Sequence, residues 1–479
     1  MLKQSKIIII GIKNINIFWF RQDLRIMDNP GLYHACLDGK VTPIYILDNT
    51  NNHQQLGGAS KVWLYESLKK LNEKLKNKML FFSGDPEEII KDIIIKHKPK
   101  EFYWNRMYDQ WSIGRDKKIK SLLLKNNINV NTYNASMLVE PWKSLKDDDT
   151  PYKVFTPFYR KTYLSNEFDI KLYKSPNLDN LIELNNSKFL LDSLNLMTDH
   201  KWVQKLLKQW SIGEEEAHKK LKKFLKTKAE NYKEGRNYPA HNKVSFLSPH
   251  IHFGEISPKY IWIETSKNTM NNDLAHFLSE LGWREFSYYL LYHFPNLPNE
   301  NLQKKFNRFP WNNNKKLLNL WKKGLTGYPI VDAGMRELYQ TGYMNNRVRM
   351  IVASFLVKNL LIHWNEGQKW FWECLFDADL ANNSASWQWV AGSGADAAPY
   401  FRIFNPVLQA KKFDPDGKYI KKFVPELKNL ENKYLFAPWE VDDKILKSRN
   451  IILGSNYPKP IVDLKESRNI ALKAFETLV

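Results

Sequence analysis

Two carboxylates and two indoles lie close together in residues 377–389, which read DADLANNSASWQW. Asp377 and Asp379 are two residues apart, and such a pair could ligate a divalent metal ion. No histidine or further carboxylate follows at ligand spacing, so we expect no metal site. Trp387 and Trp389 would point in different directions on a helix, because residues two apart do not share a face. We therefore expect Trp387 and Trp389 to serve different roles.

A second polar and aromatic stretch, SELGWREFSYYL, spans residues 279–290. On a helix, Glu280 and Arg284 would be neighbours one turn apart, with Trp283 beside them. A binding site and an ordinary surface salt bridge both explain this pattern. From this stretch alone, the salt bridge is the better interpretation.

A third stretch, MNNRVRM (344–350), places polar residues in the first turns of an apolar helix. Arg347 and Arg349 follow Asn345 and Asn346 there. Cations are unfavourable at the positive end of a helix dipole. Carboxylates or phosphates are therefore expected to face these guanidinium groups, although a solvated face also fits.

A fourth stretch, NKVSFLSPHIHFGEISP (242–258), carries Ser245 and Ser248 ahead of a helical pattern. Hydroxyls and free backbone N–H groups at a helix start can hold a phosphate. The alternative is an ordinary helix cap.

The elements that position these residues begin with an α/β region. Apolar residues recur on one helix face from Leu64 to Leu75, and Pro86 marks another helix start. Short β-rich runs alternate with these helices, which predicts a parallel sheet with helices on both faces. No GxGxxG motif follows the first run, so a standard dinucleotide site is not expected there. The strands are expected at 15–20, 41–48, 79–82, 102–105 and 128–133.

The rest of the chain changes character twice. Residues 145–205 lack sustained periodicity and carry Pro, Asn and Asp, as a long connector does. From 206 onward helical patterns dominate. We therefore predict an α/β domain at 1–144, a linker at 145–205 and an all-α domain at 206–479. One apolar stripe of the helical part is formed by Val348, Ile351, Val352, Phe355 and Leu356.

The composition is that of a globular protein, with 43% hydrophobic and 26% charged residues among 479. No apolar run has the length of a membrane span, and the N-terminal run is too short for a signal peptide. The chain has only two cysteines, Cys36 and Cys374, which excludes a disulfide framework and a cysteine-based zinc site. We expect a cytoplasmic protein that has no membrane partner.

The net charge of +21 favours phosphate-rich partners, nucleic acid above all. A lysine-rich codon bias is the alternative explanation of the charge. The 17 tryptophans add weight to the nucleic-acid reading, because indoles provide flat surfaces that stack on bases.

Together these stretches resemble the photolyase/cryptochrome family, most closely the bacterial photolyases that repair cyclobutane pyrimidine dimers. The resemblance covers nearly the whole chain. It implies an α/β antenna domain, a linker and a helical domain that holds FAD, with repair driven by light. The motifs that carry it are FWFRQDLRIMDNPGL (18–32), WREF (283–286), GYPIVDAGMREL (327–338), NNRVRM (345–350) and WQWVAGSGADAAPYFRIFNP (387–406).

The resemblance also assigns roles around FAD. It implies an Arg349–Asp377 pair, which would explain a cation early in that helix. It places Asn383 opposite the flavin N5, where an amide accepts a hydrogen bond without readily donating a proton. The FAD contacts that it implies are Tyr232, Val244, Ser245, Phe246, Leu247, Ser248, Phe277, Trp283, Arg284, Asn346, Arg349, Asp377, Ala378, Asp379 and Asn383.

The remaining roles concern electrons and DNA. Trp311, Trp364 and Trp387 match the family's electron relay, and together with Asn383 and Glu280 they form the implied catalytic set. The resemblance also implies that the dimer leaves the base stack, because its reacting bonds cannot be reached inside a duplex. The contacts implied for the lesion and DNA are Glu280, Trp283, Asn346, Met350 and Trp389, with Arg236, Arg347 and Arg402 at phosphates and Gln409 beside them.

Two related functions are alternatives. A cryptochrome-type photoreceptor would usually carry Asp at the position of Asn383 and often a long C-terminal tail. A six-four photoproduct photolyase would carry a His pair where Asn346 and Met350 stand. The single-strand-preferring cryptochromes and flavin oxidoreductases that do not use light fit less well.

The antenna chromophore stays open between methenyltetrahydrofolate and a deazaflavin. Ser112 and Ile113 occupy positions where folate-binding relatives have an Asn-Glu pair, so residues 103–116 would build a different pocket or none. The expected partner is UV-damaged DNA, bound by a monomer that needs no protein partner. The expected location is the bacterial cytoplasm, at the nucleoid.

Overall fold

The computed structural model describes residues 15–50, 55–165, 170–184, 190–197, 201–397, 399–400 and 402–478. Its N-terminal part is a parallel five-stranded sheet in the order β3-β2-β1-β4-β5. The predicted strands are all present, with small shifts at their ends, which confirms the α/β expectation. They are β1 (Ile15–Phe20), β2 (Lys40–Asp48), β3 (Leu80–Gly84), β4 (Glu101–Asn105) and β5 (Asn129–Tyr133).

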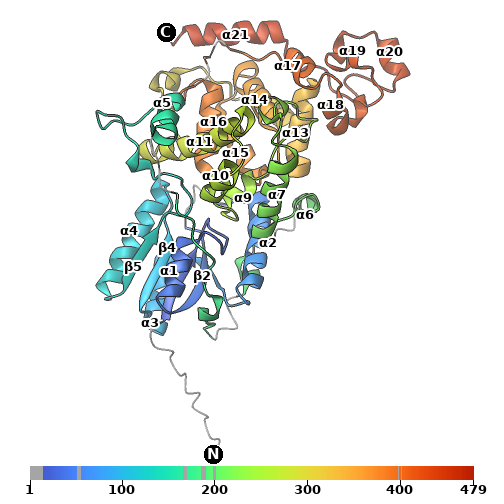
Figure 1. The fold of residues 1–479 in the computed structure, drawn as a ribbon. Coiled ribbons are helices and arrows are strands. Elements are labelled where there is room, and N and C mark those ends of the chain that lie inside the picture. The colour runs from blue at the N-terminus through green and yellow to red at the C-terminus, as the bar shows by residue number, and fades with distance from the viewer. Residues whose placement is uncertain are drawn as a thin grey trace, which may run out of the picture.

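Helices cover both faces of the sheet (Figure 1). Alternate residues of β1 point to opposite faces. Phe18 and Phe20 pack with the helices α1 (Pro30–Leu37) and α2 (Gly58–Lys74), whereas Ile17 and Trp19 pack with α3 (Pro86–His97) and α4 (Gln110–Lys125). The predicted leucine face of α2 is buried. Helix α3 begins as expected, with Pro86 in its first turn and the Asp85 carboxylate accepting from the backbone N–H of Glu87.

Short helical turns occupy the expected connector. They are η1 (Pro141–Lys143), α5 (Phe155–Tyr159), η2 (Arg160–Leu164), η3 (Leu178–Asn180) and η4 (Leu191–Leu194). Helix α6 (Lys201–Leu207) begins before the expected boundary at 206. The domain boundaries therefore stay a prediction.

The second part is helical and lies at the other end of the molecule from α3 (Figure 1). None of the helices in the described ranges is long and apolar enough to cross a membrane. The helices are α7 (Glu214–Thr227), α8 (Tyr232–Gly235), α9 (Ser248–His252), α10 (Pro258–Ser266), α11 (Asn272–His293), α12 (Lys315–Lys322), α13 (Pro329–Thr341), α14 (Asn346–Ser354), α15 (Trp364–Cys374), α16 (Leu380–Ala391), α17 (Pro406–Phe413), α18 (Lys418–Phe423), α19 (Asn432–Leu435), α20 (Asp443–Ser448) and α21 (Leu464–Glu476); short 3-10 turns are η5 (Lys304–Arg308), η7 (Pro425–Leu427) and η8 (Pro438–Glu440).

The predicted apolar stripe of residues 348–356 is fully buried. Its helix is not regular throughout, however. Helix α14 passes at Phe355 into a π-helical turn, η6 (Phe355–Asn359), and α15 begins only at Trp364. Single π turns inside helices often occur at functional sites.

A buried arginine joins the two parts of the chain. Arg25, 1% exposed, lies in the loop after β1. Its guanidinium donates to the carbonyls of Asp28 (2.8 Å), Ala135 (2.7 Å) and Gly254 (3.0 Å). Gly254 follows α9, so this one side chain links the sheet edge to the helical part.

We predict that Arg25→Leu lowers the free energy of unfolding by about 3 kcal/mol or more, because it leaves buried carbonyls without donors. Denaturant-induced unfolding would measure the change. Arg308→Leu removes an exposed arginine and should stay within about 0.5 kcal/mol of the parent. Equal values for the two variants would contradict this role of Arg25.

Candidate functional site

Asp379 begins α16 and organises the centre of the helical part. One carboxylate oxygen accepts from the backbone N–H of Asn382 at 2.8 Å, as a helix N-cap does. The other accepts from the Tyr288 hydroxyl of α11 and lies 3.7 Å from the His252 imidazole. Burial alone would raise the pKa of Asp379, but these neighbours lower it to about 2. Asp379 is therefore an anion at any physiological pH.

Asp377 forms the expected pair with Arg349. The Arg349 Nη2 donates to both carboxylate oxygens, at 3.0 and 2.8 Å. The Ser248 hydroxyl also donates to Asp377, at 2.6 Å. Ser248 makes no cap for α9, so the helix-cap interpretation of this serine is wrong. Among the described residues, the second terminal nitrogen of Arg349 has no hydrogen-bond partner, which leaves donors for a ligand.

Asn383 is oriented by its amide nitrogen. This nitrogen donates to the backbone carbonyl of Gln368 in α15 at 3.1 Å. A carbonyl can only accept, so the amide cannot be flipped without losing this bond. The Asn383 side-chain oxygen has no hydrogen-bond partner among the described residues and is not fully buried. The residue therefore presents an acceptor to the space beside α16.

Arg284 pairs differently from the expectation. It donates to its neighbour Glu285 at 2.8 Å and lies against the Tyr288 ring, while Glu280 is held elsewhere. The interpretation of Glu280 and Arg284 as a surface salt bridge is therefore wrong. Arg284 bends toward the buried centre, where the anion of Asp379 also acts on it. Burial raises the pKa of Glu285 to about 7, against the opposing effect of Arg284.

Glu280 instead binds Arg236, which lies just after α8. The two guanidinium nitrogens of Arg236 donate to the two carboxylate oxygens at 2.6 and 2.7 Å. The structure thus joins a residue expected at the lesion with one expected at a phosphate. Asn345 extends the cluster by donating to the Arg236 backbone carbonyl at 3.2 Å.

Asn346, Arg347 and Met350 lie together at the start of α14. Arg347 donates to the Asn237 side chain at 2.7 Å, and its Nη1 lies 3.8 Å from the Met350 sulfur. Asn346 is exposed, and among the described residues its amide nitrogen has one hydrogen-bond contact, to that sulfur at 4.0 Å. This cluster adjoins the Arg236–Glu280 pair through Asn345 and forms a polar rim.

Of the two tryptophans expected to contact the lesion, only Trp283 lies near this rim in the described contacts. Trp283 lies one helical turn from Glu280 and stacks on Phe155 of α5, with ring centroids 3.8 Å apart. Trp389 is partly buried, whereas Trp387 is 2% exposed, so the two indoles differ in their exposure to solvent. The described contacts connect neither Trp389 nor Gln409 to the rim.

Of the three tryptophans expected in the relay, Trp387 and Trp364 are buried and Trp311 is partly exposed. The Trp387 ring lies against Gly367 of α15, where a Cβ atom would collide with it. Trp364 is fully buried and donates to the Asn301 side chain at 2.8 Å. His363 lies between Trp364 and the partly exposed Trp311, with centroid distances of 5.3 and 5.0 Å.

The remaining residues expected at FAD surround the 244–248 loop. Phe246 has a φ of 56°, an uncommon left-handed conformation for a non-glycine residue. Such backbone geometry is often found where a loop holds a ligand. Tyr232 and Phe277 are buried and pack edge to face nearby, with centroids 5.5 Å apart. The other members are Val244, Ser245, Leu247 and the buried Ala378.

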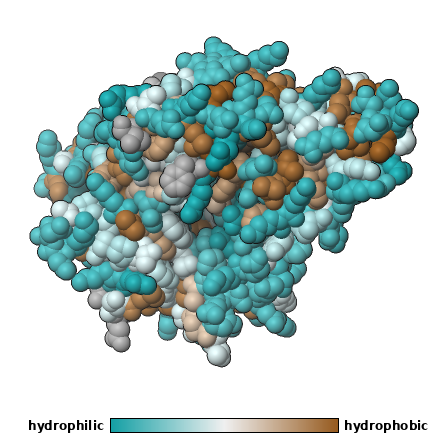
Figure 2. All heavy atoms as spheres, turned by 90° about the horizontal axis from the view of Figure 1, so that it is seen from above, coloured by the Kyte–Doolittle hydropathy of each residue, from teal (hydrophilic) through white to brown (hydrophobic). Residues whose placement is uncertain are grey.

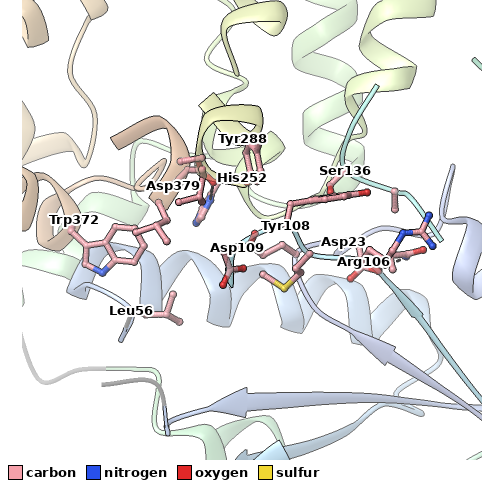
Figure 3. Close-up of a pocket in the computed structure, with 17 residues that line it drawn as sticks. Asp23, Leu56, Arg106, Tyr108, Asp109, Ser136, His252, Tyr288, Trp372 and Asp379 are labelled. Atoms are coloured by element: carbon pink, nitrogen blue, oxygen red, sulfur yellow. Dashed lines mark hydrogen bonds and ion pairs between the residues drawn. The ribbon is translucent and has the colours of Figure 1, made fainter. Parts of the chain in front are cut away.

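A small cavity of about 80 Å³ lies between the sheet edge and the helical part. Figure 3 shows His252, Tyr288 and Asp379 on one side of it and Asp23 and Arg106 on the other. The stretch 105–109 lines it, but Ser112 and Ile113 do not. Its volume is well below the ~300 Å³ at which ligand pockets begin. In the described residues, no cluster of His, Cys, Asp or Glu side chains could hold a metal ion.

Three residues of this site were missed from sequence. His252 and Tyr288 stand in stretches already singled out, but only their contact with Asp379 gives them a role. Gln368 acts through its backbone carbonyl, which no side-chain pattern can reveal.

Known proteins match over almost all of the chain. Residues 16–176 match the family described as DNA photolyase, and residues 277–477 match the FAD binding domain of DNA photolyase. The chain is 44% identical to the deoxyribodipyrimidine photo-lyase of Agrobacterium fabrum, covering 96% of this chain and 97% of that one. It is 34% identical to cryptochrome-2 of Arabidopsis thaliana, covering 96% and 78%.

Solved structures agree. A bacterial class III photolyase from Agrobacterium tumefaciens superposes with a TM-score of 0.92 at 42% identity, covering 99% of both chains. The cryptochrome of Synechocystis sp. PCC6803 superposes with a TM-score of 0.88 at 29% identity, covering 96% of this chain and 99% of that one.

We predict that Arg349→Leu weakens FAD retention at least about tenfold, because it leaves the buried Asp377 carboxylate without its cation. The measurement is FAD absorbance per protein after gel filtration, followed by titration with free FAD. Arg336→Leu is the matched control, since it breaks the similarly buried Arg336–Glu426 pair (2.8 Å) in α13. If both variants lose FAD equally, the effect is on folding and not on the site.

Proposed function

Since the chain belongs to the DNA photolyase family and carries that family's FAD-binding domain, we propose that it repairs cyclobutane pyrimidine dimers in DNA under blue light. The substrate is UV-damaged DNA, bound by a monomer. The place of action is the bacterial cytoplasm, at the nucleoid. Folate and deazaflavin remain the candidate antenna chromophores.

Asn383 is the observation that carries the proposal. Its amide nitrogen is committed to the Gln368 carbonyl, so its neutral oxygen is left as an open acceptor among the described residues, on the helix that Asp379 caps. A neutral amide accepts a hydrogen bond but holds no exchangeable carboxylic proton. This suits a reduced flavin that must keep its negative charge until it is excited. A photoreceptor of the plant type is expected to have an aspartate here.

The donors present fit FAD. Arg349 and Arg284 are cations with unfilled donor positions, and Asp377 and Asp379 are acceptors held by other side chains. Ser248 and the strained Phe246 belong to the loop expected at the FAD phosphates. The chemistry that FAD supplies in this family is light-driven transfer of one electron to the lesion. The protein's own part is to orient the cofactor and to exclude water around Asp379 and Tyr288, which are buried.

The polar rim next to α11 supports the proposal that this surface binds the lesion. Glu280 offers carboxylate oxygens to the polar edges of bases, and Trp283 offers an apolar ring one turn away. In the proposed complex, a DNA phosphate replaces Glu280 as the ion-pair partner of Arg236. Glu280 can then bind the flipped bases. Trp387, Trp364 and Trp311 supply electrons to the cofactor from the protein surface.

A cryptochrome-type photoreceptor is the second candidate. The similarity to cryptochromes of Arabidopsis thaliana and Synechocystis supports it. The two candidate functions predict different outcomes for DNA, because a photoreceptor would reduce FAD in light and leave DNA lesions unrepaired.

The decisive experiment is a repair assay. The protein with reduced FAD should restore oligonucleotides containing a thymine dimer under blue light but not in darkness. A parallel substrate with a six-four photoproduct should stay unrepaired. Photoreduction without repair of either lesion would favour the photoreceptor, and repair of the six-four lesion alone would overturn the proposed specificity.

We predict that Trp387→Phe slows photoreduction at least about tenfold, since phenylalanine is far harder to oxidise than an indole at this first hop. Repair should remain near the parent rate when FAD is reduced chemically. Flavin absorbance during illumination and repair per flash would separate the two effects. Trp439→Phe, in η8 beside Tyr328, is the control and should change neither. Equal loss of both activities in Trp387→Phe would show that Trp387 is not an electron relay.

A further inference from the structure

Lys358 is a buried cation without an anion. It lies in the π-helical turn η6 and is 2% exposed. Its ammonium donates to the backbone carbonyl of Arg402 at 3.0 Å and lies 5.3 Å from the centre of the Tyr400 ring. In the part of the chain that the structure describes, no carboxylate forms an ion pair with it. A buried charge is normally paired, because burial removes its hydration.

The charge of Lys358 is sensitive to what happens at Arg402. Burial, and then the positive charge of Arg402, lower the pKa of Lys358 to about 8. Because Arg402 lowers this pKa, an anion that neutralises Arg402 must raise it again. Arg402 itself is exposed, with its backbone tied to Lys358. Its guanidinium is therefore free to meet a phosphate from solution.

In the part of the chain that the structure describes, the titratable side chain placed against Lys358 is Tyr400. Tyr400 faces it, and burial raises the pKa of this phenol, so the ring stays neutral. Tyr400 stacks on Phe475 of α21 at 4.8 Å, and Asn359 of η6 donates to Ser467 of α21 at 3.0 Å. From α14, the Ser354 hydroxyl accepts from the backbone N–H of Phe404 at 3.4 Å. The turn, α21 and the 402–404 segment thus pack together around the Lys358 ammonium.

This unit belongs to the end of the molecule that carries α17 and α21. Figure 2 views that end, where hydrophilic side chains cover most of the visible surface. Helix α17 begins two residues after Phe404, with Asn405 as its N-cap, and adds Lys411 and Lys412 in its last turn. A polyanion can therefore approach Arg402 across a surface that is polar and basic.

We propose that the counter-ion of Lys358 is the DNA phosphate bound at Arg402, so that the protein takes up a proton on Lys358 when it binds DNA. The inference rests on the proposed function, because it needs DNA at this face. Lys358 is a positioning residue: it holds the backbone of Arg402 and supplies a second positive charge behind it, without touching the lesion.

The sign of the pH effect follows from the proposal. Only protonated Lys358 favours the phosphate, and the bound phosphate keeps it protonated. Affinity for DNA should therefore fall as the pH rises through the pKa of the free protein. If the pKa in the complex lies well above 9, the loss between about pH 7 and about pH 9 approaches tenfold.

The test measures the dissociation constant of the FAD-loaded protein for dimer-containing DNA at both pH values, in darkness. Lys358→Met should bind more weakly at the lower pH and show almost no pH dependence. Lys358→Arg should restore tight binding and keep it at the higher pH, because a guanidinium does not titrate there. Lys96→Met, which removes an exposed lysine of α3 at the far end of Figure 1, should behave like the parent.

Two further readouts separate this role from a merely structural one. Calorimetry of the parent protein in two buffers of different ionisation enthalpy should reveal proton uptake on DNA binding near pH 8, and this needs no variant. Lys358→Met should melt no lower than the parent at neutral pH, since it removes an unpaired buried charge.

The possible failures can be told apart. A parent protein that binds damaged DNA with pH-independent affinity and no proton uptake overturns the role of Lys358 and leaves the repair function standing. A Lys358→Met variant with the parent's pH slope does the same. A parent protein that does not bind dimer-containing DNA at any pH overturns the proposed function, and the inference falls with it.

Discussion

The helical part depends on where α16 begins, and Asp379 decides that. Its carboxylate caps the helix, accepts from Tyr288 of α11 and lies beside His252 of α9. Once the first turn is set, the helical period determines every later direction. Asn383, one turn on, donates to the Gln368 carbonyl of α15, and Trp387, a further turn on, lies buried against the same helix. A start one residue later would rotate both side chains by roughly 100°.

The site is also shaped by the cost of burying charge. Arg349, Arg284 and Asp377 each have a partner, and the helix cap, Tyr288 and His252 satisfy Asp379. The Arg236–Glu280 pair at the rim holds two groups that the proposed substrate would separate. Lys358 departs from this pattern, since nothing in the described residues neutralises it. A buried charge left unpaired in a free protein is a natural place for coupling to a charged ligand.

Sequence patterns predicted most of the framework because they reflect local rules. Alternating apolar runs predicted the strands, and Pro86 predicted the start of α3. The apolar stripe of 348–356 predicted a buried helix face, but not the π turn at Phe355, because its residues satisfy either helical geometry. The Glu280–Arg284 pair was wrong for a related reason. Helical spacing allowed this pair. In the structure, however, Glu280 accepts two hydrogen bonds from Arg236, forty-four residues upstream, and Arg284 pairs with Glu285.

The sequence by itself determined the two-part architecture, the basic charge and the identity of the stretches that carry chemistry. Residue type and local period are written in the chain, and the family motifs are long and contiguous. The tertiary structure decided which of these residues meet. The direction of the Asn383 oxygen depends on a backbone carbonyl of α15, and the missing anion of Lys358 depends on everything packed around η6. Such contacts join positions that are distant in sequence, and only the packing of helices brings them within hydrogen-bond distance.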